Sequence, residues 1–483
     1  MHFGQSFAQS AFYYKHEKPY SNAPYDIVET EAGFFIVGIS DRPDAFGDGF
    51  MMLLDKQGNH LWDKIVPADK IEDYRAVIEF DNYFYVAGYR WVNNKRRNLI
   101  MKVDINGVIS WDKLFGDTLI LGGDNSVQDI ISNEQGFLIA SSGFDTISLT
   151  TNAELIQLDF DGNLIWEKTY GTDEYEERVD RLKRIEPTEE GYMLILNAEN
   201  QFWQFFPYII KIDKYGNELW RKNLRFYKPE TSDSDSLIYF KDAFPDSEGN
   251  IIGYFNRVNL SNYKSHHIFI TFDKNGNEIS YYQSPETYGV AWVDMYINSA
   301  NEIFVIGQQD LDTVGKYYMQ LFASKFDKDF NSIWEHHYGD TTNNEIQFSG
   351  IPTSDNGVII GGRNLVMPYA GANQVFNSVL VKTDCNGSLE WNYESCISSE
   401  TEDVLIFPNP FSEYFNIHLP NLPAESELKI YIYNLAGQKV ANYQFLDSNT
   451  IQIEGSEFAN GIYALKIYLN NEEYYTGKVV KVG

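Results

Sequence analysis

Histidine pairs are the residues of this chain whose types first suggest metal chemistry. They occur as His266-His267 and His336-His337. Neighbouring residues of a β-strand point to opposite faces of a sheet, so neither pair is a natural two-point ligand and ordinary surface or core histidines are favoured. The motifs HExxH, GxSxG, GxGxxG and the P-loop are absent from the sequence. We therefore predict no catalytic residue, no metal site and no cofactor.

Carboxylates are abundant, and the run Asp173–Glu177 is the densest example. Such a run is typical of a solvated surface, and an acid/base pair depends on a geometry that the sequence does not supply. The segment Asp159–Asn163 resembles the start of a calcium loop but lacks the remaining ligands and the closing glutamate. Because this segment type recurs through the chain, a hairpin turn is favoured over a calcium site.

Aromatic and basic side chains gather in a few segments of variable length. Their types suit a glycan or a protein partner, which aromatic rings and arginines commonly contact. The alternative is that these aromatics cover their own β-sheets. The candidate ligand-binding residues are Tyr89, Trp91, Arg96 and Arg97 in YRWVNNKRRN, Phe202 and Trp203 in ENQFWQFFPY, and Tyr369 in NLVMPYAGANQ.

Composition limits the partners of this chain. Its 483 residues carry a formal net charge of −31. Binding to phosphates needs a basic surface, so the charge argues against nucleic acid and against an anionic membrane surface. No apolar run approaches the ~18 residues of a membrane-spanning helix, so no membrane insertion is predicted. Residues 1–20 show no signal peptide; if the chain is exported, a leader is expected upstream or already removed.

The two cysteines, Cys385 and Cys396, allow at most one intramolecular disulfide. Cys385 lies at a predicted hairpin turn, and Cys396 ends the strand predicted to follow it. An extended strand of that length separates its ends by roughly 20 Å, whereas a disulfide needs Cα atoms within about 7 Å. The spacing therefore favours unpaired cysteines and leaves the bond as the alternative.

An internal repeat organises most of the chain. Seven times, an apolar run leads to an Asp, a Gly/Asn turn and an aromatic residue. Each copy holds four strand-like runs, and the middle two are apolar on consecutive positions, as in FFIVG and FMMLL. Consecutive apolar residues are typical of strands covered on both faces. The aromatic residues are Trp62, Trp111, Trp166, Trp220, Tyr281, Trp334 and Trp391.

These repeats predict an all-β fold, a seven-bladed β-propeller in which each blade packs between two neighbours. In each turn the Asp accepts backbone N–H bonds, and Gly or Asn takes the positive-φ position. The aromatic residue then lies on the fourth strand as a wedge against the next blade. Two copies depart most from the pattern, one with Tyr281 as the wedge and one with Phe330 in place of the turn glycine. The connection between the second and third strands varies in length, so its face is the candidate binding face.

The repeats resemble those of the quinoprotein-like propellers, which also dock a Trp after an Asp/Gly turn. The spacing differs by a residue and no quinone-binding set is visible, so the resemblance implies the architecture alone. It covers roughly residues 20–395. Seven complete copies fit after Tyr25, which leaves ring closure open; Phe12–Lys15 could add an outer strand to the last blade.

After Glu402 the pattern changes to short alternating strands. Apolar residues at 428, 430 and 432 alternate with Lys429, Tyr431 and Tyr433, as expected for a strand with one buried face. Turns are predicted at Asn434–Gly437 and at Asn460-Gly461, the second as a hairpin. The segment 404–483 is therefore predicted to be a small Ig-like β-sandwich.

The motifs of this segment resemble the type A C-terminal sorting domain carried by cargo of the type IX secretion system in Bacteroidetes. PNP, LAGQKV, GIYALKI and GKVVKV occur in that order at the end of the chain. The resemblance implies that an outer-membrane translocon reads the domain, which is then usually removed, and that the cargo reaches the surface or the medium. The sorting-signal residues carried over are Pro408, Asn409, Pro410, Gly437, Gly461, Tyr463, Lys478 and Lys481.

The chain is thus expected to hold an N-terminal segment (1–19), a propeller (20–397), a linker (398–403) and the sorting domain (404–483). The favoured function is a secreted or cell-surface binding or adhesion protein without catalytic activity, its ligand a glycan or a protein. The alternative is a secreted polysaccharide hydrolase or lyase with its site in the propeller funnel. A purely structural surface protein is the third hypothesis.

Overall fold

The computed structural model consists of β-strands and turns, with no α-helix in the part that it describes. The chain divides into two compact units, Phe12–Lys382 and a second unit that contains Thr383–Gly483. None of the described segments forms a helix that could cross a membrane. The described residues are 11–18, 21–41, 47–67, 71–93, 95–115, 126–145, 150–170, 177–200, 205–224, 236–259, 264–285, 287–310, 319–339, 344–366, 375–389, 404–407, 411, 414–419, 426–434, 437–446, 450–470 and 472–481.

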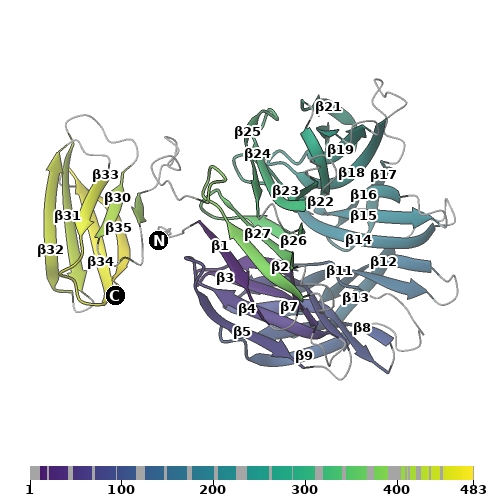
Figure 1. The fold of residues 1–483 in the computed structure, drawn as a ribbon, viewed down its shortest axis with the longest axis horizontal. Helices are drawn as coiled ribbons and strands as arrows, with labels where there is room; N and C mark the ends of the chain where they lie inside the picture. Colours follow the sequence, from purple (N-terminus) through teal and green to yellow (C-terminus); the bar gives the residue numbers. More distant parts are fainter. Residues whose placement is uncertain are drawn as a thin grey trace. The chain divides into compact units, whose positions relative to one another are not determined.

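The first unit is a seven-bladed propeller, as predicted, and each blade has four antiparallel strands in the described segments (Figure 1). The strands, grouped by blade, are β2 (Ser21–Glu29), β3 (Phe34–Asp41), β4 (Asp48–Leu54) and β5 (His60–Val66); β6 (Glu72–Phe80), β7 (Tyr83–Val92), β8 (Lys95–Val103) and β9 (Ile109–Phe115); β10 (Asp129–Asn133), β11 (Gly136–Asp145), β12 (Thr150–Leu158) and β13 (Leu164–Tyr170); β14 (Glu177–Thr188), β15 (Gly191–Asn200), β16 (Phe205–Asp213) and β17 (Glu218–Asn223); β18 (Ser236–Pro245), β19 (Ile251–Asn259), β20 (Lys264–Phe272) and β21 (Glu278–Gln283); β22 (Thr287–Ile297), β23 (Ile303–Asp310), β24 (Met319–Phe326) and β25 (Ser332–Tyr338); and β26 (Asn344–Pro352), β27 (Val358–Val366), β28 (Val375–Lys382) and β1 (Phe12–His16).

The first strand of each blade is the innermost one. Each of these strands contacts the first strand of the next blade, from β2 through β6, β10, β14, β18, β22 and β26, and β26 returns to β2. The ring is therefore closed, and the middle strands of the blades are covered on both sides. β3 has four consecutive residues that are fully buried, Phe34, Phe35, Ile36 and Val37. This confirms the prediction that strands with consecutive apolar residues are covered on both faces.

The Asp turn between the third and fourth strands has the predicted geometry. Asp55 Oδ1 accepts hydrogen bonds from the backbone N–H groups of Gln57 and Asn59 at 2.9 and 2.8 Å. The same pair of bonds recurs in the other six blades. Bonds of this kind favour the ionised carboxylate, and they hold the pKa of Asp159 and Asp213 below its usual range.

In blades 1 to 4 the tryptophan that follows the turn lies against the turn glycine of the next blade. A Cβ atom added at Gly107 would lie 2.7 Å from the Trp62 ring, and one at Gly162 would lie 2.8 Å from Trp111. Both glycines also have a positive φ, of 72° and 76°, which side chains disfavour. Lys64 adds a hydrogen bond to a backbone carbonyl of the same turn at 2.7 Å. Each of these four blades is thus joined to the next by a tryptophan ring packed on a turn glycine.

The two departures from the pattern meet at one interface. Ser280 stands opposite Thr271, in the register that the tryptophans occupy in other blades. Tyr281 comes one residue later, stands opposite Ile270 and is 37% exposed. In the turn of the next blade, Phe330 takes a positive φ of 65°. Its ring stacks on Phe269 at 5.0 Å and on Tyr282 at 5.6 Å between centroids. A ring supplied by the turn therefore fills the space that the missing tryptophan leaves.

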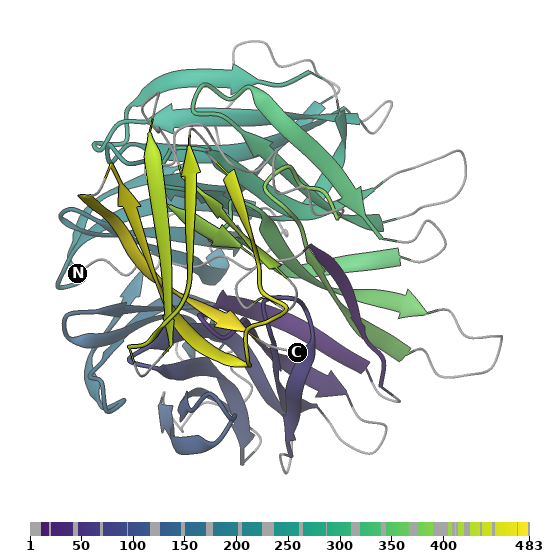
Figure 2. The ribbon, with the colours of Figure 1, turned by 90° about the vertical axis from the view of Figure 1, so that its left-hand side faces the viewer.

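The N-terminal strand β1 closes the ring. It pairs antiparallel with β28, so the purple N-terminal strand lies among the green strands of the last blade (Figure 2). Phe12 stands opposite Lys382, as Trp111 stands opposite Lys102 in blade 2. A Cβ added at Gly58, in the turn of blade 1, would lie 2.5 Å from the Phe12 ring. Phe12 is therefore the wedge of the last blade, a place that the sequence assigned to Trp391, which lies outside the described residues.

The expectation of unpaired cysteines is wrong. Cys385 is disulfide-bonded, and none of the described cysteines is free. The other cysteine of the chain, Cys396, lies outside the described residues. The expectation required an extended fourth strand after Cys385. In the structure β1 holds the outer position of that blade, so the segment after Cys385 is not needed there.

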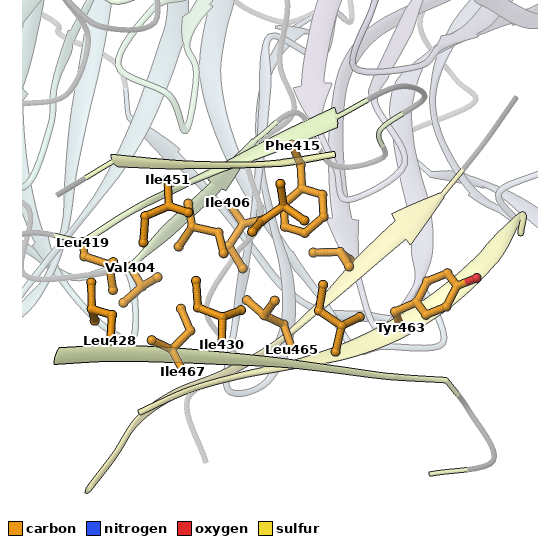
Figure 3. Packing of buried hydrophobic residues seen from close by; sticks show 14 of the residues in the cluster. Val404, Ile406, Phe415, Leu419, Leu428, Ile430, Ile451, Tyr463, Leu465 and Ile467 are labelled. Carbon is orange, nitrogen blue, oxygen red and sulfur yellow. The ribbon is translucent and has the colours of Figure 1, made fainter. Parts of the chain in front are cut away.

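The second unit is a β-sandwich of a three-stranded and a four-stranded sheet. Leu428 and Ile430 of β31 point into the core that the two sheets enclose (Figure 3). Ile432 belongs to the same buried cluster, which confirms the predicted alternation. The predicted hairpin at Asn460-Gly461 is wrong, because the strands before and after it, β33 and β34, pair in different sheets. The strands are β29 (Leu405–Phe407), β30 (Tyr414–His418) and β33 (Thr450–Glu454) in one sheet, and β32 (Lys439–Leu446), β31 (Glu427–Asn434), β34 (Gly461–Leu469) and β35 (Glu472–Lys481) in the other.

Replacing the closing wedge tests the role of β1. We expect Phe12→Ala to lower the free energy of unfolding by about 2 kcal/mol, because it removes a ring packed on the turn of blade 1. Urea denaturation measures the change. Tyr215→Ala, which removes a 55% exposed ring from the turn of blade 4, is the control and should change stability little. Equal effects of the two substitutions would contradict closure by Phe12.

Candidate functional site

The hairpin β7–β8 holds part of the predicted ligand-binding set together. Arg96 stands opposite Trp91, and Tyr89 stands two positions before Trp91 on the same strand. The Arg96 guanidinium lies 4.7 Å from the centre of the Tyr89 ring and 5.6 Å from that of Trp91. Arg97 turns elsewhere and donates to the backbone carbonyl of Leu114 at 3.3 Å. The structure therefore separates Arg97 from the other three.

The set continues onto the neighbouring inner strands. The Arg75 guanidinium lies 3.9 Å from the centre of the Tyr25 ring and 5.9 Å from that of Tyr89. Asp73 holds Arg75 in place by accepting hydrogen bonds from its Nε at 3.0 Å and its Nη2 at 2.6 Å. Tyr25 meets Phe348 of the last blade edge-on, at 5.3 Å between ring centroids. Contact thus runs from blade 2 through blade 1 to blade 7.

Arg363 completes the sequence of contacts on blade 7. Its guanidinium lies 4.7 Å from the centre of the Phe348 ring and 5.0 Å from that of Phe376. We call the eight residues the arginine–aromatic ladder. In contact order they are Trp91, Arg96, Tyr89, Arg75, Tyr25, Phe348, Arg363 and Phe376.

β-bulges position the middle of the ladder. The register of the inner strands shifts at Tyr25, Arg75 and Phe348, so each is the additional residue of a bulge. A bulge re-aims a side chain relative to the regular pleat, which brings these three into contact. All ladder residues except the buried Tyr89 are partly exposed. Within the described structure, Trp91 Nε1 and Arg363 Nε have no hydrogen-bond acceptor.

The side-chain chemistry of the ladder suits an acidic, ring-shaped ligand. Its guanidinium groups pair with carboxylates or sulfates, often through two parallel hydrogen bonds, and its partly exposed rings offer apolar faces. The sequence analysis found Tyr89, Trp91 and Arg96 because they lie in one segment. It missed Tyr25, Arg75, Phe348, Arg363 and Phe376, which come from separate repeats. Phe202, Trp203 and Tyr369 lie outside the described residues.

Partly buried aspartates at the inner strands have a structural role. Asp26 Oδ2 accepts a hydrogen bond from the backbone N–H of Val77 in the next blade at 2.8 Å. Asp129 accepts from Ile185 in the same way at 2.8 Å. Burial raises the pKa of Asp26 to about 7 despite these bonds. Their shifted pKa values therefore accompany contacts that join blades and do not by themselves indicate catalysis.

Two glutamates of blade 3 are candidates for an acid/base pair. Burial and the charge of Glu167 raise the pKa of Glu154 to about 8, and burial also raises the pKa of Glu167. Glu167 lines a cavity of about 550 Å³ together with Tyr170, Glu218 and Arg221. For metal binding, the described residues bring together one group of three, His16, His60 and Asp63.

The sorting-signal residues occupy the sandwich. Gly437 has a positive φ of 76° in the β31–β32 turn, and the Tyr463 hydroxyl donates to a backbone carbonyl at 2.7 Å. Lys478 and Lys481 lie on the edge strand β35. Pro408, Asn409 and Pro410 lie outside the described residues. Phe411, directly after them, donates its backbone N–H to β35 at 2.9 Å.

Comparison with known proteins identifies the second unit. Residues 405–482 match the family described as the secretion system C-terminal sorting domain. The predicted resemblance is confirmed, and the domain is a type IX sorting domain of type A. A curated relative, ulvan lyase NLR42 from Nonlabens ulvanivorans, is 28% identical over 109 residues. That match covers 22% of this chain and 20% of the relative, so it spans about a fifth of each.

Solved structures resemble the chain at the level of the fold alone. Sqt1 from Chaetomium thermophilum is 9% identical over 79% of this chain and 100% of its own, with a TM-score of 0.41. Hsv2 from Kluyveromyces lactis is 10% identical over 74% and 98%, with a TM-score of 0.37. The extracellular domain of a hybrid two-component system from B. thetaiotaomicron is 9% identical over 95% and 55%, with a TM-score of 0.38. Similarities of this size carry no functional argument.

The raised pKa of Glu154 predicts a pH-dependent stability. The pKa of Glu154 is about 8 in the folded chain and roughly 4.3 in an unfolded chain. The protonated side chain therefore stabilises the fold fully below about pH 4, and this stabilisation is lost as pH rises through about 8. Glu154→Gln removes this dependence, so between about pH 5 and about pH 9 its melting temperature should fall about 2–4 °C less than that of the parent. Thermal unfolding checks this, with the exposed Glu248→Gln as the control. Parallel pH profiles for parent and Glu154→Gln would contradict the prediction.

Proposed function

We propose that this protein is an exported, non-catalytic binding protein whose propeller holds an acidic glycan on the arginine–aromatic ladder. Its sorting domain makes it a substrate of the type IX secretion machinery, so the chain is delivered to the cell surface or secreted. An extracytoplasmic destination agrees with the disulfide at Cys385, since such bonds persist in oxidising compartments.

The ladder is the observation that carries this proposal. Three arginines are concentrated along one run of partly exposed rings in a protein whose net charge is −31. Such a local positive stripe attracts anions, while the surrounding negative charge repels them elsewhere on the surface. Sugar rings with carboxylate or sulfate groups offer both an apolar face and an anion. A neutral glycan would offer the apolar face but no anion for the arginines.

A polysaccharide-degrading enzyme is the second candidate function. Two observations favour it: the cavity beside Glu167 with the neighbouring Glu154, and the short match to a protein named ulvan lyase. The first candidate is preferred because three charged groups and their ring partners converge on the ladder, whereas the glutamates have a shifted pKa without a defined substrate position. Ulvan therefore belongs in the test panel as ligand and as substrate.

Binding to acidic polysaccharides tests the ladder. The purified full chain is titrated by calorimetry with ulvan and alginate, and with laminarin as a neutral control. We expect binding to the acidic polymers only, weakening as salt is raised because charges are screened. Arg96→Ala should weaken binding about tenfold, by loss of a charge-assisted contact of about 1.4 kcal/mol. Arg97→Ala, on the same strand but outside the ladder, should have little effect.

The outcomes separate the candidates. Equal losses in Arg96→Ala and Arg97→Ala would show general charge attraction and contradict the ladder. Release of unsaturated or shortened sugars from any polymer would contradict the non-catalytic proposal and support the polysaccharide-degrading enzyme. Loss of that release in Glu154→Gln and Glu167→Gln would then place the activity at these glutamates.

Removal of the sorting domain tests the export route. In a host with the type IX system and with a Sec leader added, the full chain should reach the surface or the medium. A chain that ends at residue 403 should stay in the periplasm, because the translocon has no domain to read. Cell fractionation and mass spectrometry of the exported form check both expectations. Export of both forms would contradict type IX sorting of this chain.

A further inference from the structure

Three side chains with metal-ligand chemistry meet where the propeller ring closes. His16 ends β1 on the last blade, while His60 and Asp63 lie on β5 of the first blade. His60 Nε2 is 2.8 Å from Asp63 Oδ1, and His16 Nε2 is 3.8 Å from Asp63 Oδ2. One ligand atom from each residue lies within 4.8 Å of the other two.

The burial of His16 is an independent observation that points to a ligand. Its side chain is 4% exposed, and its Nε2 has no hydrogen-bond partner among the described residues. A buried polar atom without a partner is unfavourable, so such atoms usually indicate a missing contact. On the other side of the ring, the Tyr14 hydroxyl lies 3.1 Å from Nδ1. A second contact of this kind orients a histidine that binds a metal.

We propose that His16 Nε2, His60 Nε2 and an Asp63 carboxylate oxygen bind one Zn²⁺ ion, with water as the fourth ligand. Zinc bonds to nitrogen and oxygen are about 2.0–2.2 Å long, so ligand atoms around a tetrahedral ion lie about 3.4 Å apart. The observed separations need only small side-chain rotations to reach that value. Imidazole nitrogens select zinc over calcium or magnesium, which prefer oxygen ligands alone.

Lys18 competes with the metal for the same carboxylate. Its Nζ lies 3.2 Å from Asp63 Oδ1, and its side chain is 31% exposed. A bound zinc ion replaces this ammonium as the counter-charge of Asp63, and Lys18 turns into solvent. Lys18 is thus a residue whose removal strengthens the site.

The site joins the two ends of the ring. β1 is held in its blade by pairing with β28 on one edge, and zinc adds a link from β1 to the outer strand of the first blade. Binding to the folded chain alone stabilises it in proportion to zinc concentration. This role does not depend on any glycan binding by the ladder.

Zinc titration of the full chain tests the site. The protein is purified without a histidine tag, stripped with EDTA and titrated with ZnCl₂ by calorimetry, and its melting temperature is measured with and without zinc. We expect one ion per chain with a dissociation constant of about 1 μM or below and a higher melting temperature. His60→Ala and Asp63→Asn should each weaken binding about tenfold or more and remove the thermal shift. Lys18→Met should tighten binding several-fold.

A matched control uses an exposed histidine on the outer strand of blade 6. His336→Ala should leave both the affinity and the thermal shift unchanged. Visible absorption of the cobalt-loaded protein, typical of a four-coordinate site in the parent and lost in His60→Ala, gives a readout that stability does not affect. Absence of saturable binding, or equal binding by the parent and His60→Ala, would overturn the proposal.

Discussion

The packing of one aromatic ring on one bare turn determines how the blades assemble. A tryptophan on the fourth strand of a blade rests on the glycine of the next turn, and nothing larger than hydrogen fits there. The Asp of that turn holds the backbone in the required shape through its two N–H bonds. Since each blade supplies both a ring and a turn, one local rule repeated along the chain yields a closed ring. At the interface of Tyr281 and Phe330 the turn supplies the ring. What the interface requires is therefore an aromatic ring that fills the space between two blades, and either blade can supply it.

The fold was largely predictable because its determinants are local in sequence. The Asp turn, the wedge at Trp111 and the double-sided burial of Phe34–Val37 each need only neighbouring residues to recognise. Closure was not predictable in the same way. Phe12 lies far from its repeat and does not follow its sequence pattern, so only the pairing of β1 with β28 reveals it. The disulfide at Cys385 was misjudged for the same reason.

Part of the candidate site could be predicted from the sequence. Tyr89, Trp91 and Arg96 share one hairpin, so composition and spacing were enough to single them out. Tyr25, Arg75 and Phe348 come from three repeats and meet because their strands bulge at corresponding positions. A bulge adds one residue to a strand without changing the amino-acid composition of the segment. The alternation of apolar and polar residues along the sequence therefore does not reveal where a bulge lies. His16 and His60 were missed because they meet only through ring closure.

The position of β1 also has a kinetic consequence. This strand is the first part of the propeller to be synthesised, yet its partner β28 is the last. Contacts between such distant segments form slowly, since a long loop must close before they contribute. The first strand therefore waits without its partner until the whole propeller sequence has emerged. A chain built in this way completes its ring late, only once both ends of the propeller sequence are present together.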